Sequence, residues 1–338
     1  MTDTLSLINS YSNLTIFFMA FLSVLFTTFF LKKISLKMGF VDKPSKRSNH
    51  PKPIALGGGI GIIAVVLSLS IFFVPNWHTI NSVILLILFL ISILDDIVNV
   101  NIFARLCTHI FCSSLYIISY LADDVSNLFI NNFLITKIVI YSIAILSLAW
   151  FINAFNFMDG VDGITSVYSI TILFSLIFLY QYLSFEVNSL HYLLSGAIIA
   201  FLFFNWHPAK IFLGDAGSIP IGFIIAHLLL DLALRGFWVS ALILPLYYIM
   251  DTSVTIFIRL IQKRKLWESH SDHFYQQGIR KGRTHYQVCY IIIFSSFGTF
   301  LLSYFAVVFK NNILFLLIGI TWCTFFLLNF KRSINKKN

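Results

Sequence analysis

Charged residues are scarce in this chain of 338 residues, since Asp, Glu, Lys and Arg make up 11% of it and apolar residues 58%. A soluble protein of this length could not bury so much apolar surface, so the composition predicts an integral membrane protein. The formal net charge is +9, but the basic residues are dispersed between apolar runs, without a nucleic-acid-reading motif. We therefore expect the basic residues to act at the membrane surface, and we expect no nucleic-acid partner.

Cysteine motifs and a cleavable leader are also missing. The four cysteines show no CxxC or zinc-type spacing and all lie in apolar runs, so packing in the core accounts for them. The first apolar run lacks a basic N-terminal flank and a small-residue cleavage site. It is therefore predicted to be a retained membrane span rather than a signal peptide.

Long apolar runs dominate the rest of the chain, and eleven are long enough to cross a bilayer, which takes about 17 to 25 residues. They lie near residues 11–31, 54–74, 78–94, 102–121, 135–152, 164–184, 188–206, 217–234, 237–259, 286–309 and 312–330. Assigning loops to alternate sides puts 20 of the 23 Lys and Arg residues on one side. The positive-inside rule makes that side cytoplasmic and places the N-terminus outside. The expected fold is one all-α membrane domain, residues 1–338, with about eleven transmembrane helices and a cytoplasmic C-terminus.

One stretch, NAFNFMDGVDGI, gathers polar groups that a membrane protein otherwise avoids. Asn153, Asn156, Asp159 and Asp162 follow one another at intervals of three residues, and a glycine follows each aspartate. Helical spacing of three keeps neighbours on one face, so two amides and two carboxylates are expected to point toward one place. This pattern predicts a site for a cation and a phosphorylated ligand. The alternative is a polar helix cap with turn glycines.

Two further acidic stretches lie at predicted helix ends on the same side. Asp95 and Asp96 end an apolar run in LDDIVN, where two buried carboxylates would need a cation or water. A solvated helix end is the alternative. Asp215 stands in IFLGDAGS at a predicted helix start, where backbone N–H groups attract anions. Phe212, three residues earlier, could offer a flat face to a base.

Two cytoplasmic loops and one buried acid complete the candidates. The loop VDKPSKRSNHPKPIALGGG carries Lys46 and Arg47 before a glycine-rich helix start, which suits either an anion cradle or an ordinary positive-inside loop. Asp251 lies inside an apolar run, where a carboxylate is functional by default unless it serves hydrogen bonding between helices. The late loop WESHSDHFYQQGIRKGRTH carries His270 and His273 and can cap a site on the membrane face. Its spacing disfavours a zinc finger.

These stretches together resemble the motifs of the polyprenyl-phosphate N-acetylhexosamine-1-phosphate transferases, glycosyltransferase family 4. That membrane family includes the enzymes that start O-antigen, enterobacterial common antigen and teichoic-acid linkage units, and the peptidoglycan enzyme that makes lipid I. The resemblance covers the first basic loop, LDDIVN, NAFNFMDGVDGI, IFLGDAGS and the late histidine loop, in the family's order, from Val41 to about His285. Loops 32–53, 95–104, 153–163, 207–218 and 260–285 are then expected to form the active-site face.

The resemblance implies roles for individual residues. Asp215 would bind Mg²⁺, for which Mn²⁺ could substitute, while Asp95 and Asp96 would lie at the diphosphate and the lipid phosphate. Asn156 and Asp159 would contact the nucleotide end. The implied catalytic set is Asp95, Asp96, Asp159 and Asp162, and the implied substrate-binding set is Asn156, Phe212 at the uracil, Lys46, Arg47, and His270 and His273 at the sugar or diphosphate.

The resemblance also implies a function: transfer of N-acetylhexosamine 1-phosphate from a UDP-sugar to undecaprenyl phosphate, with release of UMP, in the bacterial inner membrane. The partners would be the UDP-N-acetylhexosamine, the lipid substrate and membrane lipid, with a homodimer left open. Asn99 stands at the usual third acidic or amide position after LDD, and SHSDHFYQQ replaces a run of close histidines. The late loop resembles the O-antigen-initiating branch of Gram-negative bacteria, so GlcNAc or a 6-deoxy relative is the expected sugar.

Two other functions compete with this one. A transporter of a phosphorylated or anionic solute could also use intramembrane acids, but transporters bind near the bilayer midplane, whereas these motifs sit on one face. A transferase of the CDP-alcohol type would crowd its aspartates into one short segment, and here they are spread over several loops.

Overall fold

The computed structural model describes the backbone of residues 2–44, 52–74, 77, 79–128, 134–265 and 270–332. The predicted substrate-binding residues Lys46 and Arg47 lie outside this described part. The helices are α1 (Thr2–Met38), α2 (Gly58–Phe73), α3 (Thr79–Val98), α4 (Ile102–Leu128), α5 (Leu134–Phe157), α6 (Ile164–Tyr182), α7 (Ser189–Asn205), α8 (Asp215–Leu232), α9 (Trp238–Ile243), α10 (Leu246–Ile261), α11 (Phe274–Arg280), α12 (His285–Phe309) and α13 (Asn312–Lys331). A π-helical turn, η1 (Ala233–Phe237), joins α8 to α9. Strands β1 (Val41–Asp42) and β2 (Ile54–Ala55) pair antiparallel.

Eight helical segments of the described chain are long and apolar enough to cross a membrane. They are Asn13–Met38, Thr79–Val98, Ile102–Tyr120, Thr136–Phe157, Ile164–Tyr182, Asp215–Ile243, His285–Phe309 and Asn312–Lys331. Helices α2 and α7 are apolar but shorter. Large apolar side chains such as Phe26, Phe72 and Ile313 are exposed on the bundle, as expected of a surface that faces lipid. The all-α, multi-pass class is therefore confirmed, while the count of eleven spans stays a prediction.

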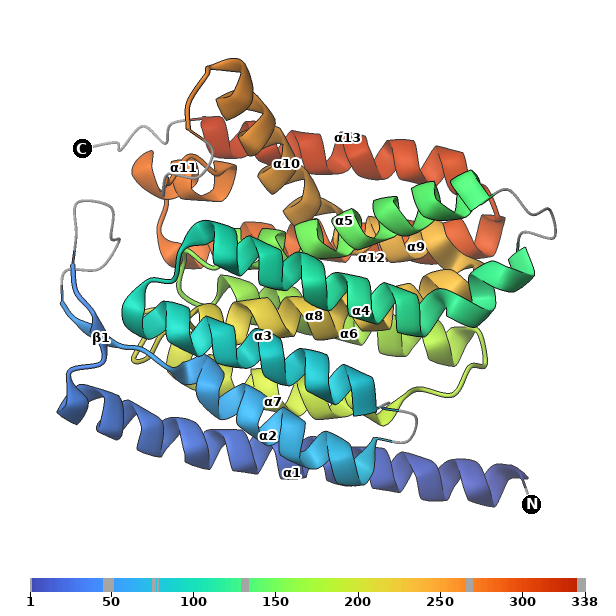
Figure 1. The fold of residues 1–338 in the computed structure, drawn as a ribbon, viewed down its shortest axis with the longest axis horizontal. Coiled ribbons are helices and arrows are strands. Elements are labelled where there is room, and N and C mark those ends of the chain that lie inside the picture. Colours follow the sequence, from blue (N-terminus) through green and yellow to red (C-terminus); the bar gives the residue numbers. More distant parts are fainter. Residues whose placement is uncertain are drawn as a thin grey trace.

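Helix α8 lies inside the bundle and packs against α2, α3, α5 and α6 (Figure 1). Its residues from Ala216 to Leu229 are all buried. The start of α2 approaches it very closely, because a Cβ atom on Gly59 would lie 2.2 Å from the backbone nitrogen of Gly217. Only glycine fits at this contact, so the glycine-rich sequence after the first loop serves helix packing at the start of α8.

The predicted span 237–259 is wrong as a single helix. Its residues form α9 and α10, which are separated at Leu244 and Pro245. Proline has no N–H to donate and clashes with the preceding turn, so the helix breaks there although the run stays apolar. The segment Asp215–Ile243 instead continues through η1 as one candidate span of 29 residues.

The polar loops gather at one end of the bundle, on the left in Figure 1, where the β1–β2 hairpin and α11 lie. A parallel bridge between Ala55 and Ile211 ties the hairpin to the segment before α8. Helix α12 begins beside this end with a capping box, in which Thr284 Oγ1 accepts from Gln287 N at 3.2 Å and Gln287 Oε1 accepts from Thr284 N at 3.0 Å. The start of α1 and the end of α13 lie at opposite ends of the bundle (Figure 1).

Candidate active site

Two acidic residues from two motifs meet at one arginine. Arg105 Nη1 donates to Asp215 Oδ2 at 3.0 Å and also to Asp95 Oδ2, so α4 joins the end of α3 to the start of α8. Their side chains are mostly buried. The structure thus brings Asp95 and Asp215 together, as the motifs predict. Sequence reasoning missed Arg105, which counted only as one positive charge in a loop.

The third carboxylate, Asp96, caps the start of α8. Its two oxygens accept from the backbone nitrogens of Asp215 and Ala216, at 2.9 and 3.0 Å. A carboxylate at a helix N-terminus satisfies free N–H groups and interacts favourably with the helix dipole. Gly214 (φ +73°) leaves room for it, because a Cβ atom there would lie 2.6 Å from an Asp96 oxygen. Its implied place at a substrate phosphate stays a prediction.

The end of α5 reaches the same place through Asn156. Its Nδ2 donates to Asp215 Oδ2 at 3.1 Å, and its Oδ1 accepts from Ser218 Oγ at 3.0 Å. The side chains of Asp95, Asp96, Asp215, Asn156 and Arg105 form what we call the acidic cluster. The cluster holds three carboxylates and one arginine, so two negative charges are left over when all are ionised.

The expectation that four polar residues share one face is wrong beyond Phe157. Helix α5 ends there, and the chain turns through Asp159 to Gly163, whose φ of +79° leads into α6. Asn153 Nδ2 donates to Ala149 O within its own helix at 2.7 Å, whereas Asn156 bonds to Asp215. Asp162 points to other partners. The chain leaves α5 before Asp159 and enters α6 after Gly163, so helical spacing no longer places the side chains of Asp159 and Asp162.

Asp162 is held by two histidines that are distant in sequence. Its Oδ2 lies 2.6 Å from His207 Nδ1 and accepts from Ala209 N at 3.0 Å, while its Oδ1 lies 3.3 Å from His285 Nδ1. Burial alone would raise the pKa of Asp162, but its hydrogen bonds and the charge of His285 lower that pKa overall. We name these three residues the histidine clasp. It joins the turn 158–163 to the segment before α8 and to the start of α12.

The pKa of Asp159 shifts in the opposite direction to that of Asp162, because its hydrogen bonding does not outweigh the effect of burial. Burial, together with the charges of Asp96 and Asp162, raises the pKa of Asp159 to about 7. The folded protein therefore keeps a proton on Asp159 at pH values where the unfolded chain, with its ordinary pKa of 3.8, has lost it. Stability from this group is complete below that lower pKa and is lost as pH rises toward about 7.

This difference predicts a pH-dependent stability of the ligand-free protein. Between about pH 4 and 7 the thermal midpoint of wild type should fall relative to that of Asp159→Asn, which has no such proton to lose. The measurement is a thermal unfolding series in detergent without divalent cations, with the exposed Glu186→Gln as control. Parallel pH profiles for wild type and Asp159→Asn would contradict the prediction.

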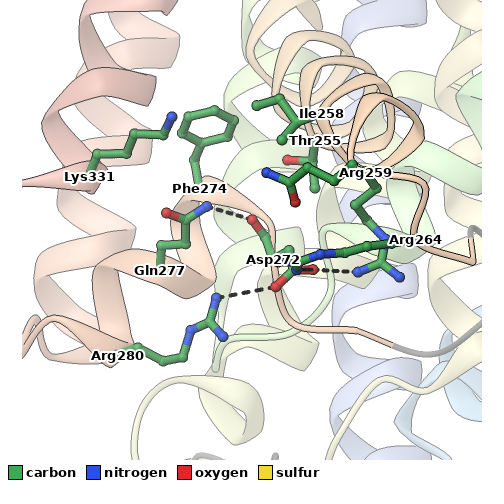
Figure 2. A pocket seen from close by; sticks show the side chains of 10 residues that line it. Thr255, Ile258, Arg259, Arg264, Asp272, Phe274, Gln277, Arg280 and Lys331 are labelled. Carbon is green, nitrogen blue, oxygen red and sulfur yellow. Dashed lines mark hydrogen bonds and ion pairs between the residues drawn. The ribbon is translucent and has the colours of Figure 1, made fainter.

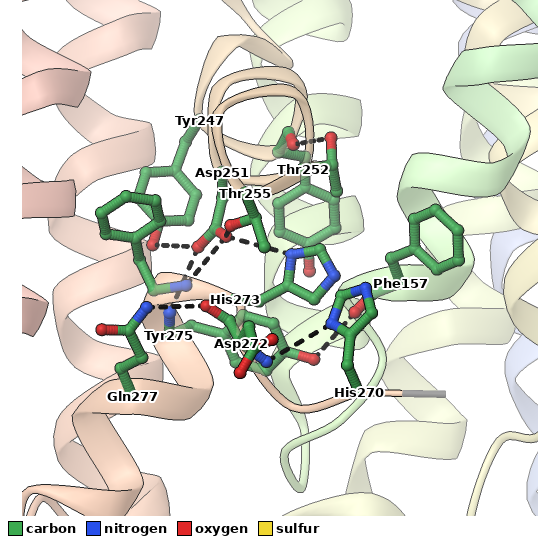
Figure 3. A network of polar contacts seen from close by, with 12 residues as sticks. Phe157, Tyr247, Asp251, Thr252, Thr255, His270, Asp272, His273, Tyr275 and Gln277 are labelled. Carbon is green, nitrogen blue, oxygen red and sulfur yellow. Dashed lines mark hydrogen bonds and ion pairs between the residues drawn. The ribbon is translucent and has the colours of Figure 1, made fainter. Parts of the chain in front are cut away.

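Asp251 anchors the late loop from inside the protein. It is fully buried, and its carboxylate accepts from Phe274 N at 2.9 Å, Tyr275 N at 3.2 Å and Tyr247 Oη at 3.1 Å (Figure 3). Thr255 Oγ1 donates to it at 3.4 Å. Asp251 therefore caps α11 from α10. The neighbouring hydroxyls of Thr252 and Ser253 contact Tyr248, Ile249 and Trp150 and not Asp251.

The other side of α11 meets the turn 158–163. Tyr275 Oη donates to Phe157 O at 2.9 Å, and a Cβ atom on Gly160 would lie 2.8 Å from Gln276 Nε2. Gln276 Oε1 is buried and has no hydrogen-bond partner among the described residues. A buried acceptor without a donor is costly, so a ligand that brings a donor would suit this position.

The two predicted histidines of the late loop differ in environment. His273 is 2% exposed, its Nδ1 lies 3.3 Å from Asp251 Oδ1, and its ring stacks on Phe157 (Figure 3). Burial, together with the charges of His273 and Arg259, lowers the pKa of His270 to about 4, so His270 is neutral near pH 7. Their contacts with a sugar or diphosphate stay predictions.

The first loop and the segment before α8 meet through backbone. Phe212 N donates to Ala55 O at 2.8 Å, and Gly58 N donates to Phe212 O at 2.9 Å. Gly59 N donates in the same way to Leu213 O. The N–H groups of Gly58 and Gly59 therefore serve this junction, and the anion cradle considered for this glycine run is wrong at these two groups. The stacking of Phe212 on a base stays a prediction.

The acidic cluster lies where several helices end at one end of the bundle. The protein is therefore a membrane protein that gathers carboxylates and an amide into one polar site at that end. Residues 77–233 match the profile of glycosyl transferase family 4. A protein of Bacillus subtilis (strain 168) named probable undecaprenyl-phosphate N-acetylglucosaminyl 1-phosphate transferase is 26% identical over 310 residues, which are 89% of this chain and 86% of that protein.

Shorter matches point the same way. The phospho-N-acetylmuramoyl-pentapeptide-transferase of Streptococcus equi subsp. zooepidemicus (strain MGCS10565) is 38% identical over 104 residues, 30% of each chain. The enzyme of that name from Streptococcus agalactiae serotype III (strain NEM316) is 34% identical over 117 residues, 33% of this chain and 34% of its own. The resemblance to the polyprenyl-phosphate N-acetylhexosamine-1-phosphate transferases that the motifs indicate is confirmed by the match to glycosyl transferase family 4 and by these relatives. The chain is a phosphoglycosyltransferase.

Proposed function

We propose that this enzyme transfers N-acetylglucosamine 1-phosphate, or a 6-deoxy relative of it, from a UDP-sugar to undecaprenyl phosphate, releasing UMP. The product would initiate O-antigen or another cell-envelope glycan. The observation that carries the proposal is the meeting of Asp95, Asp215 and Asn156 from three family motifs in one acidic cluster. A relative that aligns with 89% of this chain is named for N-acetylglucosamine. A transporter site near the bilayer midplane is disfavoured, because the acidic cluster lies at helix ends.

The donor set of the acidic cluster fits Mg²⁺. Mg²⁺ prefers carboxylate and water oxygens, and it is usually held by one or two carboxylates together with substrate phosphates. Asp215 and Asp95 offer such oxygens, and the surplus negative charge of the cluster calls for a cation besides Arg105. We infer that these two carboxylates hold Mg²⁺, with Asp96 kept in place as the cap of α8. The ion would neutralise charge on the diphosphate and on the attacking phosphate.

The reaction joins two anions, so positioning and charge neutralisation are its main needs. An oxygen of the lipid phosphate attacks the phosphorus that bears the sugar, the bond from that phosphorus to the bridging oxygen of UMP breaks, and UMP leaves. A phosphate monoester has a second pKa of about 6 and is mostly dianionic near neutral pH, so no residue has to act as base. Arg105, and by sequence Lys46 and Arg47, would reduce the repulsion between the two phosphates, which is several kcal/mol at about 4 Å.

A donor panel tests the proposal. Membranes from an expressing strain are incubated with undecaprenyl phosphate, Mg²⁺ and one labelled UDP-sugar at a time, and the lipid product and UMP are measured. We expect UMP release and labelled lipid with UDP-N-acetylglucosamine or a 6-deoxy UDP-N-acetylhexosamine. The proposal would be contradicted if no N-acetylated donor gave lipid product in an assay in which a control transferase of the same family formed its own product.

The proposal includes an orientation in the bacterial inner membrane. The N-terminus would face the periplasm and the C-terminus the cytoplasm, where the nucleotide sugar is found, because the basic loops fall on one side. A reporter that fluoresces only in the cytoplasm is expected to be active when fused after Asn338. A periplasmic reporter fused at the same place should be silent, and the reverse result would refute this orientation.

The choice of sugar is proposed to depend on Gln276. Its unpaired Oε1 lies beside the turn 158–163, and a site that hydrogen-bonds a hydroxyl discriminates strongly against an analogue without it. Gln276→Ala should change the kcat/KM ratio between UDP-N-acetylglucosamine and a 6-deoxy donor by about tenfold. Gln277→Ala is the matched control, since Gln277 Nε2 donates to Asp272 O on the other side of α11. An equal loss with both donors would mean that Gln276 does not read the sugar.

A further inference from the structure

A polar cavity of about 300 Å³ opens between α10, α11 and α13 (Figure 2). Arg259 and Arg264 come from the end of α10 and the residues after it, Arg280 from α11, and Lys331 from the end of α13. Asp272 is the one carboxylate among the described lining residues. The described walls therefore carry three surplus positive charges.

The cations outnumber what Asp272 can pair. Arg264 Nη1 lies 3.3 Å and Arg280 Nη2 3.7 Å from its oxygens, and Arg259 Nη1 also donates to it (Figure 2). Arg259 is 6% exposed, and its Nε has no hydrogen-bond partner among the described residues. The side chains of Arg264 and Arg280 are 55% and 49% exposed, so their remaining N–H groups are open to a ligand.

The cavity lies on the side of α11 that faces away from the turn 158–163. Phe274, Gln277 and Arg280 line it at helical intervals of three. Tyr275 and Gln276 point instead to Phe157 and Gly160. The cavity is therefore separated from the acidic cluster by α11 itself.

We propose that this cavity binds a phosphate group, at a site distinct from the acidic cluster. Guanidinium groups bind phosphate oxygens with paired, charge-assisted hydrogen bonds, and several of them around one cavity suit a phosphate better than a single carboxylate. The phosphate could belong to the headgroup of an anionic phospholipid, since α10 and α13 end here, or to a free phosphate in solution. It would hold Arg264 and Arg280 and so steady the late loop through Asp272.

The test measures binding rather than transfer. The purified full chain in a neutral detergent is given inorganic phosphate, phosphatidylglycerol or phosphatidylcholine, and the thermal midpoint and the retained lipid are recorded. Arg259 is buried and paired, so its loss would also destabilise the fold. The test variant is therefore Arg280→Gln with Lys331→Gln, and the control is Lys310→Gln, an exposed lysine between α12 and α13.

We expect wild type and Lys310→Gln to bind one of the two phosphate sources, and the double variant to bind it about tenfold more weakly. A response to phosphatidylglycerol alone identifies a lipid headgroup, whereas a response to inorganic phosphate as well identifies a general phosphate site. Equal affinity in wild type and the double variant, or no response of wild type to either source, would overturn the proposal. The proposed transfer reaction could fail its own donor panel without affecting this result.

Discussion

Asp215→Asn is expected to remove nearly all transferase activity, by about a thousandfold, and to abolish its dependence on Mg²⁺. A neutral amide is a weak ligand at an octahedral Mg²⁺ site, and loss of a metal that neutralises the reacting phosphates costs several kcal/mol of transition-state stabilisation. The substitution keeps the size of the side chain, and it keeps the backbone N–H of residue 215 that donates a hydrogen bond to Asp96. The fold should therefore persist while the chemistry is lost.

The measurement is kcat/KM as a function of Mg²⁺ concentration for Asp215→Asn, for wild type and for the control Asp231→Asn. Asp231→Asn is the matched control, because Asp231 is an acid on the same helix that accepts from Arg235 at 2.9 Å, far from the acidic cluster. It should retain the Mg²⁺ requirement of wild type. If Asp215→Asn keeps near-normal turnover with the same requirement, Asp215 is not the metal ligand.

The sequence predicts the acidic cluster well because polar groups are costly in apolar helices and therefore stand out. Asp95, Asp215 and Asn156 belong to three separate motifs, and the structure brings them together. Arg105 could not be recognised in this way, since a basic residue in a short loop also satisfies the positive-inside rule. A sequence shows a residue's type and local spacing, but it does not show which distant carboxylate that residue will meet.

The histidine clasp shows the same limit more clearly. His207 lies 45 residues from Asp162, and His285 lies 123 residues from it. No local pattern links residues at such separations. Local geometry fails in two further places, where Gly160 and Gly163 follow the end of α5 and where Pro245 divides a continuous apolar run. Hydropathy detects apolar composition and misses a change of backbone direction.

Asp251 gives the second large expected effect, and it acts on the late loop rather than on the reacting atoms. Asp251→Ala would leave the backbone N–H groups of Phe274 and Tyr275 and the hydroxyl of Tyr247 without their acceptor in a buried place. Each such group costs about 1 to 3 kcal/mol. The substitution should therefore weaken the docking of α11 onto the bundle by several kcal/mol, while the rest of the bundle stays folded.

Hydrogen exchange separates this local effect from general unfolding. In Asp251→Ala we expect faster exchange in residues 270–280, unchanged exchange in α8, and a loss of transferase activity of about a hundredfold, because Tyr275 and Gln276 leave the turn 158–163. Asp231→Ala provides the matched control, since it also removes a carboxylate that accepts from a tyrosine, Tyr180, but far from α11. It should leave exchange in 270–280 unchanged. Unaltered exchange there in Asp251→Ala would show that α11 is held by its other contacts, such as the bond from Tyr275 Oη to Phe157 O, and that Asp251 is not its anchor.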